Sequence, residues 1–129
     1  MADIVLDASA VLALMQAEPG SDVVAATLPG ALLGIINLAE VLTKLHVAGM
    51  PVDQSRSAVS SLGIRVADFA EEQARIVAEF RPLTITAGLS LGDRACLALA
   101  KARRLPALTG ERLWPQFAEA TGVDIRLIR

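Results

Sequence analysis

The sequence predicts an α/β protein with a five-stranded parallel sheet, formed by one domain that spans residues 1–129. Short apolar runs alternate along the chain with longer stretches of helical periodicity, a pattern typical of βαβ units. A length of 129 residues suits one domain that buries its core without disulfides or structural metals. No internal repeat, low-complexity tract or linker divides the chain, so we expect one layered structure.

The first half of the chain predicts two strands and four helices. Residues 4–6 form a short apolar run that suits a strand buried on both faces, and they deliver Asp7 to its carboxyl end. Asn37 is expected to cap a helix whose apolar side chains recur at helical spacing until Gly49. The expected elements are strands 4–6 and 32–36 and helices 11–17, 21–28, 37–48 and 52–62.

The second half predicts three more strands and three helices. Ser90 is expected to cap a long helix that ends at Arg103 or Arg104, and the apolar run that starts at Pro106 follows it as a strand. The expected elements are strands 64–66, 106–108 and 125–128 and helices 68–80, 90–103 and 112–121.

Four carboxylates fall at the ends of these predicted elements. Asp7 follows the first strand, Glu111 follows the fourth, and Glu40 and Asp93 lie in first helical turns. Ligands of open parallel sheets bind outside the carboxyl ends of the strands, so the four acids are expected to converge there. Such a pocket would be strongly repulsive without a cation, and oxygen ligands of this kind suit Mg²⁺ or Mn²⁺.

Each acid also has a purely structural interpretation. Glu40 and Asp93 stand three residues after expected cap residues, as in a capping box, and Glu40 also precedes Lys44 by four residues on a helix. Glu111 could be a first-turn acid that the helix dipole favours. Asp7 has the weakest such alternative, because Ser9 is the better-placed cap for a helix that starts near residue 10.

The net charge of −2 is unevenly distributed along the chain. Residues 1–55 carry six acids and one base, Lys44, whereas residues 56–129 carry eleven bases and eight acids. Ten of the twelve bases are arginines, which suit bidentate contact with phosphate. Solvated helix faces are an equal alternative, because the pattern alone does not place these side chains in space.

The N-terminal segment does not have the pattern of an export signal. Asp3 and Asp7 interrupt its first apolar stretch, and Pro29-Gly30 and Asn37 interrupt the most apolar span, residues 23–39. We therefore expect a cytoplasmic protein without a membrane helix.

Cys96 is the lone cysteine, which excludes an internal disulfide or a multi-cysteine zinc site and predicts a small buried core residue. Hydrophobic residues make up 53% of the chain and the mean hydropathy is +0.51. Such an apolar surplus favours a homodimer or a bound partner protein that covers part of the surface.

Four segments resemble, in order, the motif blocks of VapC-type PIN-domain toxins. They are residues 6–10 (LDASA), 37–41 (NLAEV), 90–100 (SLGDRACLALA) and 108–112 (LTGER). The resemblance covers essentially the whole chain. It implies a PIN-like fold with strand order 3-2-1-4-5, Mg²⁺- or Mn²⁺-dependent cleavage of RNA, a homodimer, and inhibition by a cognate VapB-type antitoxin.

The resemblance also implies roles for individual residues. Asp7 and Asp93 would be the main metal ligands, Glu40 would complete the acidic cluster, and Ser9, Asn37 and Thr109 would be polar supports. Glu111 departs from the family, which more often has aspartate there, and the extra methylene suits a water-mediated contact.

RNA contacts can be assigned from the same blocks. Arg94 and Arg112 lie nearest the acids in sequence and are expected to bind the RNA backbone. His46, the only histidine, is expected to border the core or solvent, and Trp114 to pack in the core.

Other phosphate chemistries fit the sequence less well. A phosphoryl-aspartate phosphatase would carry a second acid where Ser9 stands, and neither Lys44 nor Lys101 suits a receiver domain. No glycine-rich phosphate loop occurs. The alternative that stays open is a catalytically weak or inactive nuclease-like fold that binds RNA or protein, because the acids argue against it only if they converge.

Overall fold

The computed structural model describes residues 2–129, and within them five parallel strands form one sheet in the order β3-β2-β1-β4-β5. The strands are β1 (Ile4–Leu6), β2 (Ala31–Gly34), β3 (Arg65–Ala67), β4 (Ala107–Thr109) and β5 (Ile125–Leu127). Both the parallel sheet and the order 3-2-1-4-5 are confirmed. Because β1 lies between β2 and β4, the carboxyl ends of β1 and β4 are neighbours, with Leu6 opposite Leu108.

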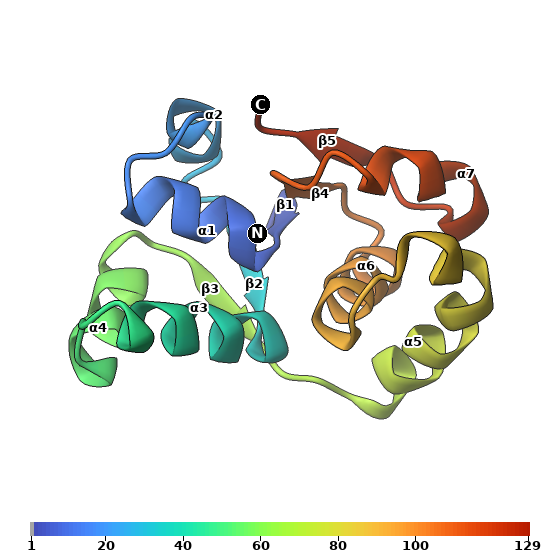
Figure 1. The fold of residues 1–129 in the computed structure, drawn as a ribbon, viewed down its shortest axis with the longest axis horizontal. Helices are drawn as coiled ribbons and strands as arrows, with labels where there is room; N and C mark the ends of the chain where they lie inside the picture. Colours follow the sequence, from blue (N-terminus) through green and yellow to red (C-terminus); the bar gives the residue numbers. More distant parts are fainter. Residues whose placement is uncertain (1) are drawn as a thin grey trace.

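Helices cover the sheet on both faces (Figure 1). They are α1 (Ala8–Met15), α2 (Ser21–Ala25), α3 (Ile35–Val47), α4 (Val52–Ser61), α5 (Glu71–Thr84), α6 (Leu91–Arg103) and α7 (Ala118–Thr121), with short 3-10 turns at η1 (Ile85–Ala87) and η2 (Trp114–Phe117). None of the helices in the described part of the chain is long and apolar enough to span a membrane.

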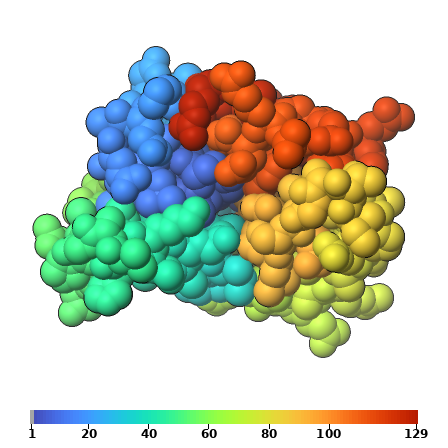
Figure 2. Space-filling view, in the orientation of Figure 1, coloured from blue at the N-terminus to red at the C-terminus, as the bar shows by residue number. Residues whose placement is uncertain are grey.

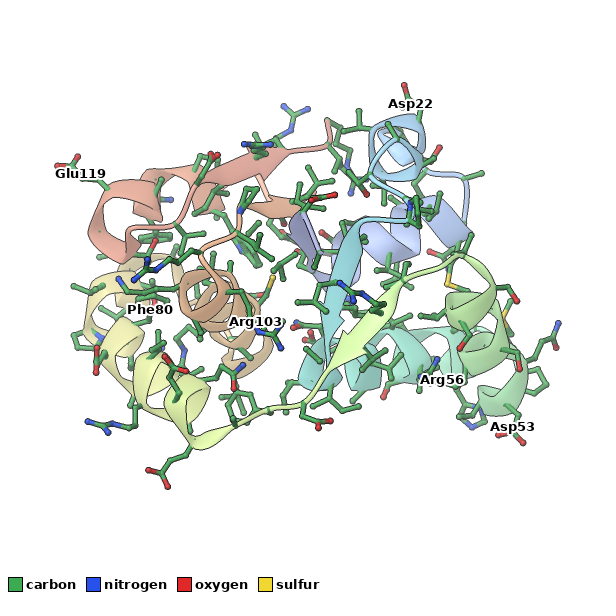
Figure 3. The ribbon with its side chains drawn as sticks, turned by 180° about the vertical axis from the view of Figure 1, so that it is seen from behind. Asp22, Asp53, Arg56, Phe80, Arg103 and Glu119 are labelled. Atoms are coloured by element: carbon green, nitrogen blue, oxygen red, sulfur yellow. The ribbon has the colours of Figure 1, made fainter. Side chains whose placement is uncertain are left out.

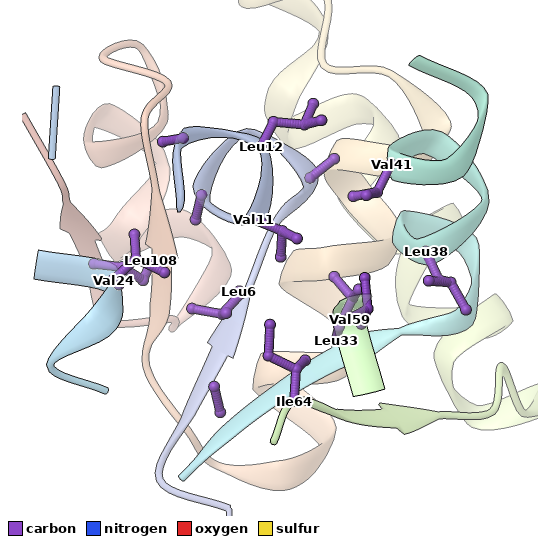
Figure 4. Packing of buried hydrophobic residues seen from close by; sticks show 14 of the residues in the cluster. Leu6, Val11, Leu12, Val24, Leu33, Leu38, Val41, Val59, Ile64 and Leu108 are labelled. Carbon is purple, nitrogen blue, oxygen red and sulfur yellow. The ribbon is translucent and has the colours of Figure 1, made fainter. Parts of the chain in front are cut away.

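Alternate residues of β1 pack into two separate cores. Ile4 and Leu6 face a cluster that includes Leu33 of β2 and side chains from α1, α3 and α4, as the close view in Figure 4 shows. Val5 faces the opposite cluster, in which α6, Phe80 and Trp114 pack. The short continuous apolar run of the first strand is therefore explained by burial on both faces.

The first four helices lie over one core and the later ones over the other. The space-filling view separates them along the molecule, with the α3–α4 segment at one end and the α5–α6 segment at the other (Figure 2). From behind, Phe80 is seen between α5 and α6 (Figure 3), and the Lys101 ammonium lies 5.7 Å from its ring centroid. That contact adds a cation–π attraction to apolar packing on this side of the sheet.

Several expected boundaries are wrong. Helix α1 begins at Ala8 rather than residue 11, because the Asp7 side chain itself caps it, and Ser9 is not the cap. Helix α3 begins at Ile35, so Asn37 lies inside its first turn. The helix expected over 112–121 is a 3-10 turn followed by the short α7, with Pro115 in that turn. Helix α5 spans 71–84 instead of 68–80.

Candidate functional site

Asp7 stands at the carboxyl end of the central strand and is 4% exposed. Its Oδ1 accepts hydrogen bonds from the Ser9 hydroxyl at 2.7 Å and from the Ala10 amide at 2.9 Å. Its Oδ2 accepts from the Thr109 hydroxyl at 2.6 Å. The Ser9 hydroxyl also lies 2.9 Å from Oδ2, so its one proton is shared between the two oxygens, and a carboxylate with about four lone-pair sites keeps room for a further partner.

The two hydroxyls that donate to Asp7 also accept from the backbone. Ser9 Oγ accepts from the Gly110 amide at 2.8 Å, and Thr109 Oγ1 accepts from the Glu111 amide at 2.9 Å. Both hydroxyl protons are therefore directed to the carboxylate, while both oxygens hold the segment that follows β4. This network fixes Asp7 and the Glu111 backbone relative to each other.

Burial is the main influence on the ionisation of Asp7. It raises the pKa of Asp7 from 3.8 to about 6, although hydrogen bonds from Thr109, Ala10 and Ser9 act in the opposite direction, and the charge of Glu111 raises it further. At neutral pH the carboxylate is ionised but has no cationic partner among residues 2–129. A bound cation at this position would relieve that cost.

Glu40 is held close to the start of α6. The Asn37 side-chain amide donates to Glu40 Oε1 at 2.9 Å and to the Gly92 carbonyl at 3.0 Å, which joins α3 to α6. The Glu40 carboxylate rests against Gly92, where a Cβ would lie only 2.3 Å from Oε2. No ion pair between Glu40 and Lys44 occurs within residues 2–129, so the surface-pair interpretation of Glu40 is wrong.

Asp93 forms the capping box that the sequence predicts at the start of α6. The Asp93 amide donates to Ser90 Oγ at 3.1 Å, and the Ser90 amide donates to Asp93 Oδ2 at 3.0 Å. The structural interpretation of Asp93 is therefore correct, but it occupies only one carboxylate oxygen. Oδ1 accepts no hydrogen bond within residues 2–129, so it is free for another partner.

Three of these acids gather around Cys96. This thiol is fully buried on α6, one turn beyond Asp93. Burial raises the pKa of Cys96 well above its ordinary value, and the charges of Asp7, Asp93 and Glu40 raise it further. Hydrogen bonds link the acids in two pairs: Thr109 and Ser9 join Asp7 to the segment of Glu111, and Asn37 joins Glu40 to the start of α6, which carries Asp93.

The residues present fit a hydrated divalent cation rather than a tightly caged one. Within residues 2–129, no three acidic, histidine or cysteine side chains are close enough together to enclose a metal ion by themselves. Mg²⁺ normally keeps several waters and is held by one or two carboxylates, so a site that offers only Asp7 and Asp93 as direct ligands fits its chemistry. Asp7 and Asp93, each with a free oxygen direction, are the side chains that could hold it directly.

The two arginines singled out by the sequence differ in their surroundings. Arg94 is half-buried and donates to the Val77 carbonyl at 3.0 Å, so its guanidinium reaches towards α5 rather than to any of the four acids. Arg112 is exposed beside Glu111. Sequence reasoning missed Lys44 and Arg129, which line a polar pocket together with Ser9 and Glu111.

The sequence comparison identifies the family. The family profile described as PIN domain matches residues 4–120, nearly the whole chain. The chain belongs to the PIN-domain family. No curated protein matches it.

Solved structures share this PIN fold over nearly their whole length. DNA-bound VapBC from Salmonella typhimurium is 15% identical, with 100% of both chains covered and a TM-score of 0.74. Mycobacterium tuberculosis VapC20, described as a sarcin-ricin loop cleaving toxin, is 16% identical, with 88% of this chain and 94% of that chain covered and a TM-score of 0.75. FitAcB from Neisseria gonorrhoeae is 23% identical, with 95% and 96% covered and a TM-score of 0.68.

Proposed function

We propose that this PIN domain, spanning residues 1–129, is a metal-dependent endoribonuclease that acts as the toxin of a VapBC-type toxin–antitoxin pair. The observation that carries the proposal is that hydrogen bonds hold the four acids in two pairs. Ser9 and Thr109 join Asp7 to the segment of Glu111, and Asn37 joins Glu40 to Gly92, the neighbour of Asp93. Asp7 and Glu111 follow the ends of the neighbouring strands β1 and β4, and sheets of this type bind ligands beyond such ends.

A bound Mg²⁺ or Mn²⁺ would polarise a phosphate oxygen and make a water molecule more acidic. In this proposal Asp7 and Asp93 hold the cation, and Glu40 completes the negative cluster beside Gly92. Glu111, whose side chain is one methylene longer than the aspartate more usual in the family, acts through water. A carboxylate such as Glu40 or Glu111 orients the attacking water and receives its proton.

The supporting polar residues keep these acids in place. Ser9 and Thr109 donate to Asp7 and hold the Glu111 segment through its amides. Asn37 joins Glu40 to the start of α6. Arg112, exposed beside the acids, binds the RNA backbone, whereas Arg94 reaches the RNA only if it leaves the Val77 carbonyl.

A cognate VapB-type antitoxin is the proposed partner, in line with the toxin–antitoxin complexes among the similar structures. An apolar groove of about 400 Å³ lined by Leu14, Met15, Met50 and Leu62 supports a partner that contributes apolar side chains. The exposed side chains of Leu83, Ile85 and Leu91 support a homodimer, because such surface usually needs cover. We expect the pair to act in the cytoplasm.

The test is cleavage of RNA by the purified chain after removal of metals with a chelator. We expect no cleavage until Mg²⁺ or Mn²⁺ is restored, and no cleavage by Asp93→Asn at any metal concentration. In cells, the chain expressed alone should arrest growth, and co-expression of its cognate antitoxin should reverse the arrest.

A second outcome would favour the alternative function. RNA binding without cleavage, by a folded chain supplied with either metal, would make the protein a catalytically weak or inactive PIN-fold binding module. Cleavage that persists in chelator would contradict the proposed chemistry altogether.

A further inference from the structure

A polar pocket of about 280 Å³ adjoins the acidic cluster and brings together segments that are far apart in the sequence. Its lining comes from α1 and the loop that follows it, from α3, from the segment after β4, and from Arg129, two residues beyond β5. Ser9 and Glu111 lie at the border with the acids, and Lys44 and Arg129 contribute the cations. Neither cation is adjacent in sequence to any acid of the cluster.

Arg129 is held in a defined position in this pocket. Its Nη1 donates to the Pro19 carbonyl at 2.9 Å. Its Nη2 lies 2.9 Å, and its Cζ 3.1 Å, from the position that a Cβ at residue 110 would occupy. Gly110 therefore gives the guanidinium room to lie directly over the backbone that carries Glu111. Within residues 2–129 the Pro19 bond is its only hydrogen bond, so most of its five N–H donors are free.

The two cations are not used to neutralise the acids nearby. Glu18 and Glu111 line the same pocket, so its formal charges balance. Nevertheless, the single ion pair within 4.0 Å in residues 2–129 is Arg126–Asp124, and neither Lys44 nor Arg129 takes part in one. Both cations are exposed and keep their charge available to a ligand.

We propose that Arg129 and Lys44 form a subsite for a backbone phosphate of the RNA that flanks the scissile phosphodiester. This inference rests on the proposed nuclease function. The planar fork of Arg129 suits two oxygens of a phosphate, and Lys44 adds a mobile point charge. The RNA strand then passes from the acidic cluster over Gly110 towards Pro19, so that the subsite positions the substrate without taking part in bond cleavage.

Because the formal charges of the pocket balance, the proposal predicts which kind of phosphate binds there. Any phosphate in the pocket meets Glu18 and Glu111 as well as the two cations, so free inorganic phosphate gains little. A phosphate of a strand that is already held at the acidic cluster is present at a high effective concentration and can still use both cations. The subsite should therefore contribute to RNA affinity and should bind inorganic phosphate poorly.

The experiment measures how the affinity for a single-stranded RNA oligonucleotide depends on salt, in an Asp93→Asn background so that binding is separated from cleavage. Each lost phosphate contact should lower the slope of log K against log salt concentration by about 0.7 and weaken binding about fivefold at 0.1 M salt. We expect this loss in Arg129→Gln and in Lys44→Gln, whereas Arg129→Lys keeps the slope because it keeps the charge. Arg75→Gln, an exposed arginine on α5, is the matched control and should leave the slope unchanged.

In the active background, Arg129→Gln should raise KM for RNA about fivefold with a smaller change in kcat, and its melting temperature should stay close to that of the unsubstituted chain. If that chain binds and cleaves RNA but both glutamine variants keep its salt slope and KM, the subsite is refuted while the proposed function stands. Loss of antitoxin binding alone in these variants would also refute it. If the unsubstituted chain neither binds nor cleaves RNA, both proposals fail.

Discussion

Replacing Asp7 by asparagine should make the metal-free protein more stable at neutral pH, by an amount that depends on pH. The carboxyl is buried and its pKa is about 6 in the folded chain, against 3.8 when it is exposed. Between these values the folded state keeps a proton that the unfolded state has lost, so stability falls as pH rises through this window. Asparagine does not titrate, and the variant lacks this fall.

The size of the effect follows from the two pKa values. Their difference corresponds to about 3 kcal/mol of unfolding free energy lost once Asp7 is fully ionised, of which roughly 2.5 kcal/mol is lost between pH 4 and pH 7. The asparagine amide must also face Thr109 Oγ1, whose proton then needs another acceptor. That cost does not vary with pH. It therefore shifts the difference in unfolding free energy by the same amount at every pH and leaves the dependence on pH unchanged.

The assay is urea unfolding in chelator at several pH values from 4 to 7, followed by the fluorescence of Trp114, which is 1% exposed. The unfolding free energy of Asp7→Asn relative to the unsubstituted chain should rise by about 2.5 kcal/mol across this range. Asp53→Asn, which removes an exposed acid on α4, is the control for the loss of one surface charge. A pH dependence for Asp7→Asn that does not exceed the one for Asp53→Asn would refute the argument that burial raises the pKa of Asp7.

Asp93→Asn should abolish RNA cleavage with little loss of stability, because an amide oxygen can still accept the N–H that closes the capping box; cleavage by this variant would remove the residue from the metal site. Glu111→Asp should preserve or raise activity, and Glu111→Gln should reduce it less than Asp93→Asn does, as kcat/KM would show. Gly92→Ala should reduce cleavage and gain none of the roughly 0.5–1 kcal/mol expected of such a helix substitution, because its Cβ would lie 2.3 Å from Glu40 Oε2. End-labelled products should carry 5′-phosphate and 3′-hydroxyl groups, with little loss in His46→Ala; a 2′,3′-cyclic phosphate formed in chelator would contradict carboxylate and metal chemistry.

The sheet and the neighbourhood of the acids could be predicted from the sequence because both depend on local signals. The apolar run before Asp7 shows a strand buried on both faces, and the spacing from Ser90 to Asp93 shows a helix start. The predicted start of α1 was wrong because one residue has two functions there. Asp7 both ends the strand and caps α1, so the helix begins earlier than its apolar periodicity indicates.

Contacts between segments that are far apart in the sequence could not be predicted from such local signals. Arg94 follows Asp93 directly, but successive helical residues point about 100° apart, and its side chain reaches Val77 instead of the acids. Arg129 lies over Gly110 only because β5 pairs with β4 and the chain then turns towards Pro19. Pro115 was a visible signal against a continuous helix from 112 to 121, since it lacks the N–H that such a helix uses.

The bond between Asn37 and Gly92 gives α3 a pivot at the end nearest the acids. Along a helix Glu40 lies about 4.5 Å from that pivot, whereas the far end at Val47 lies about 15 Å from it. A rotation that displaces Val47 by about 3 Å would therefore move the backbone of Glu40 by only about 1 Å. A displacement of the remote half of α3, beside the apolar groove, therefore reaches the backbone of Glu40 reduced about threefold, so a small tilt of the helix changes the spacing of the acids little.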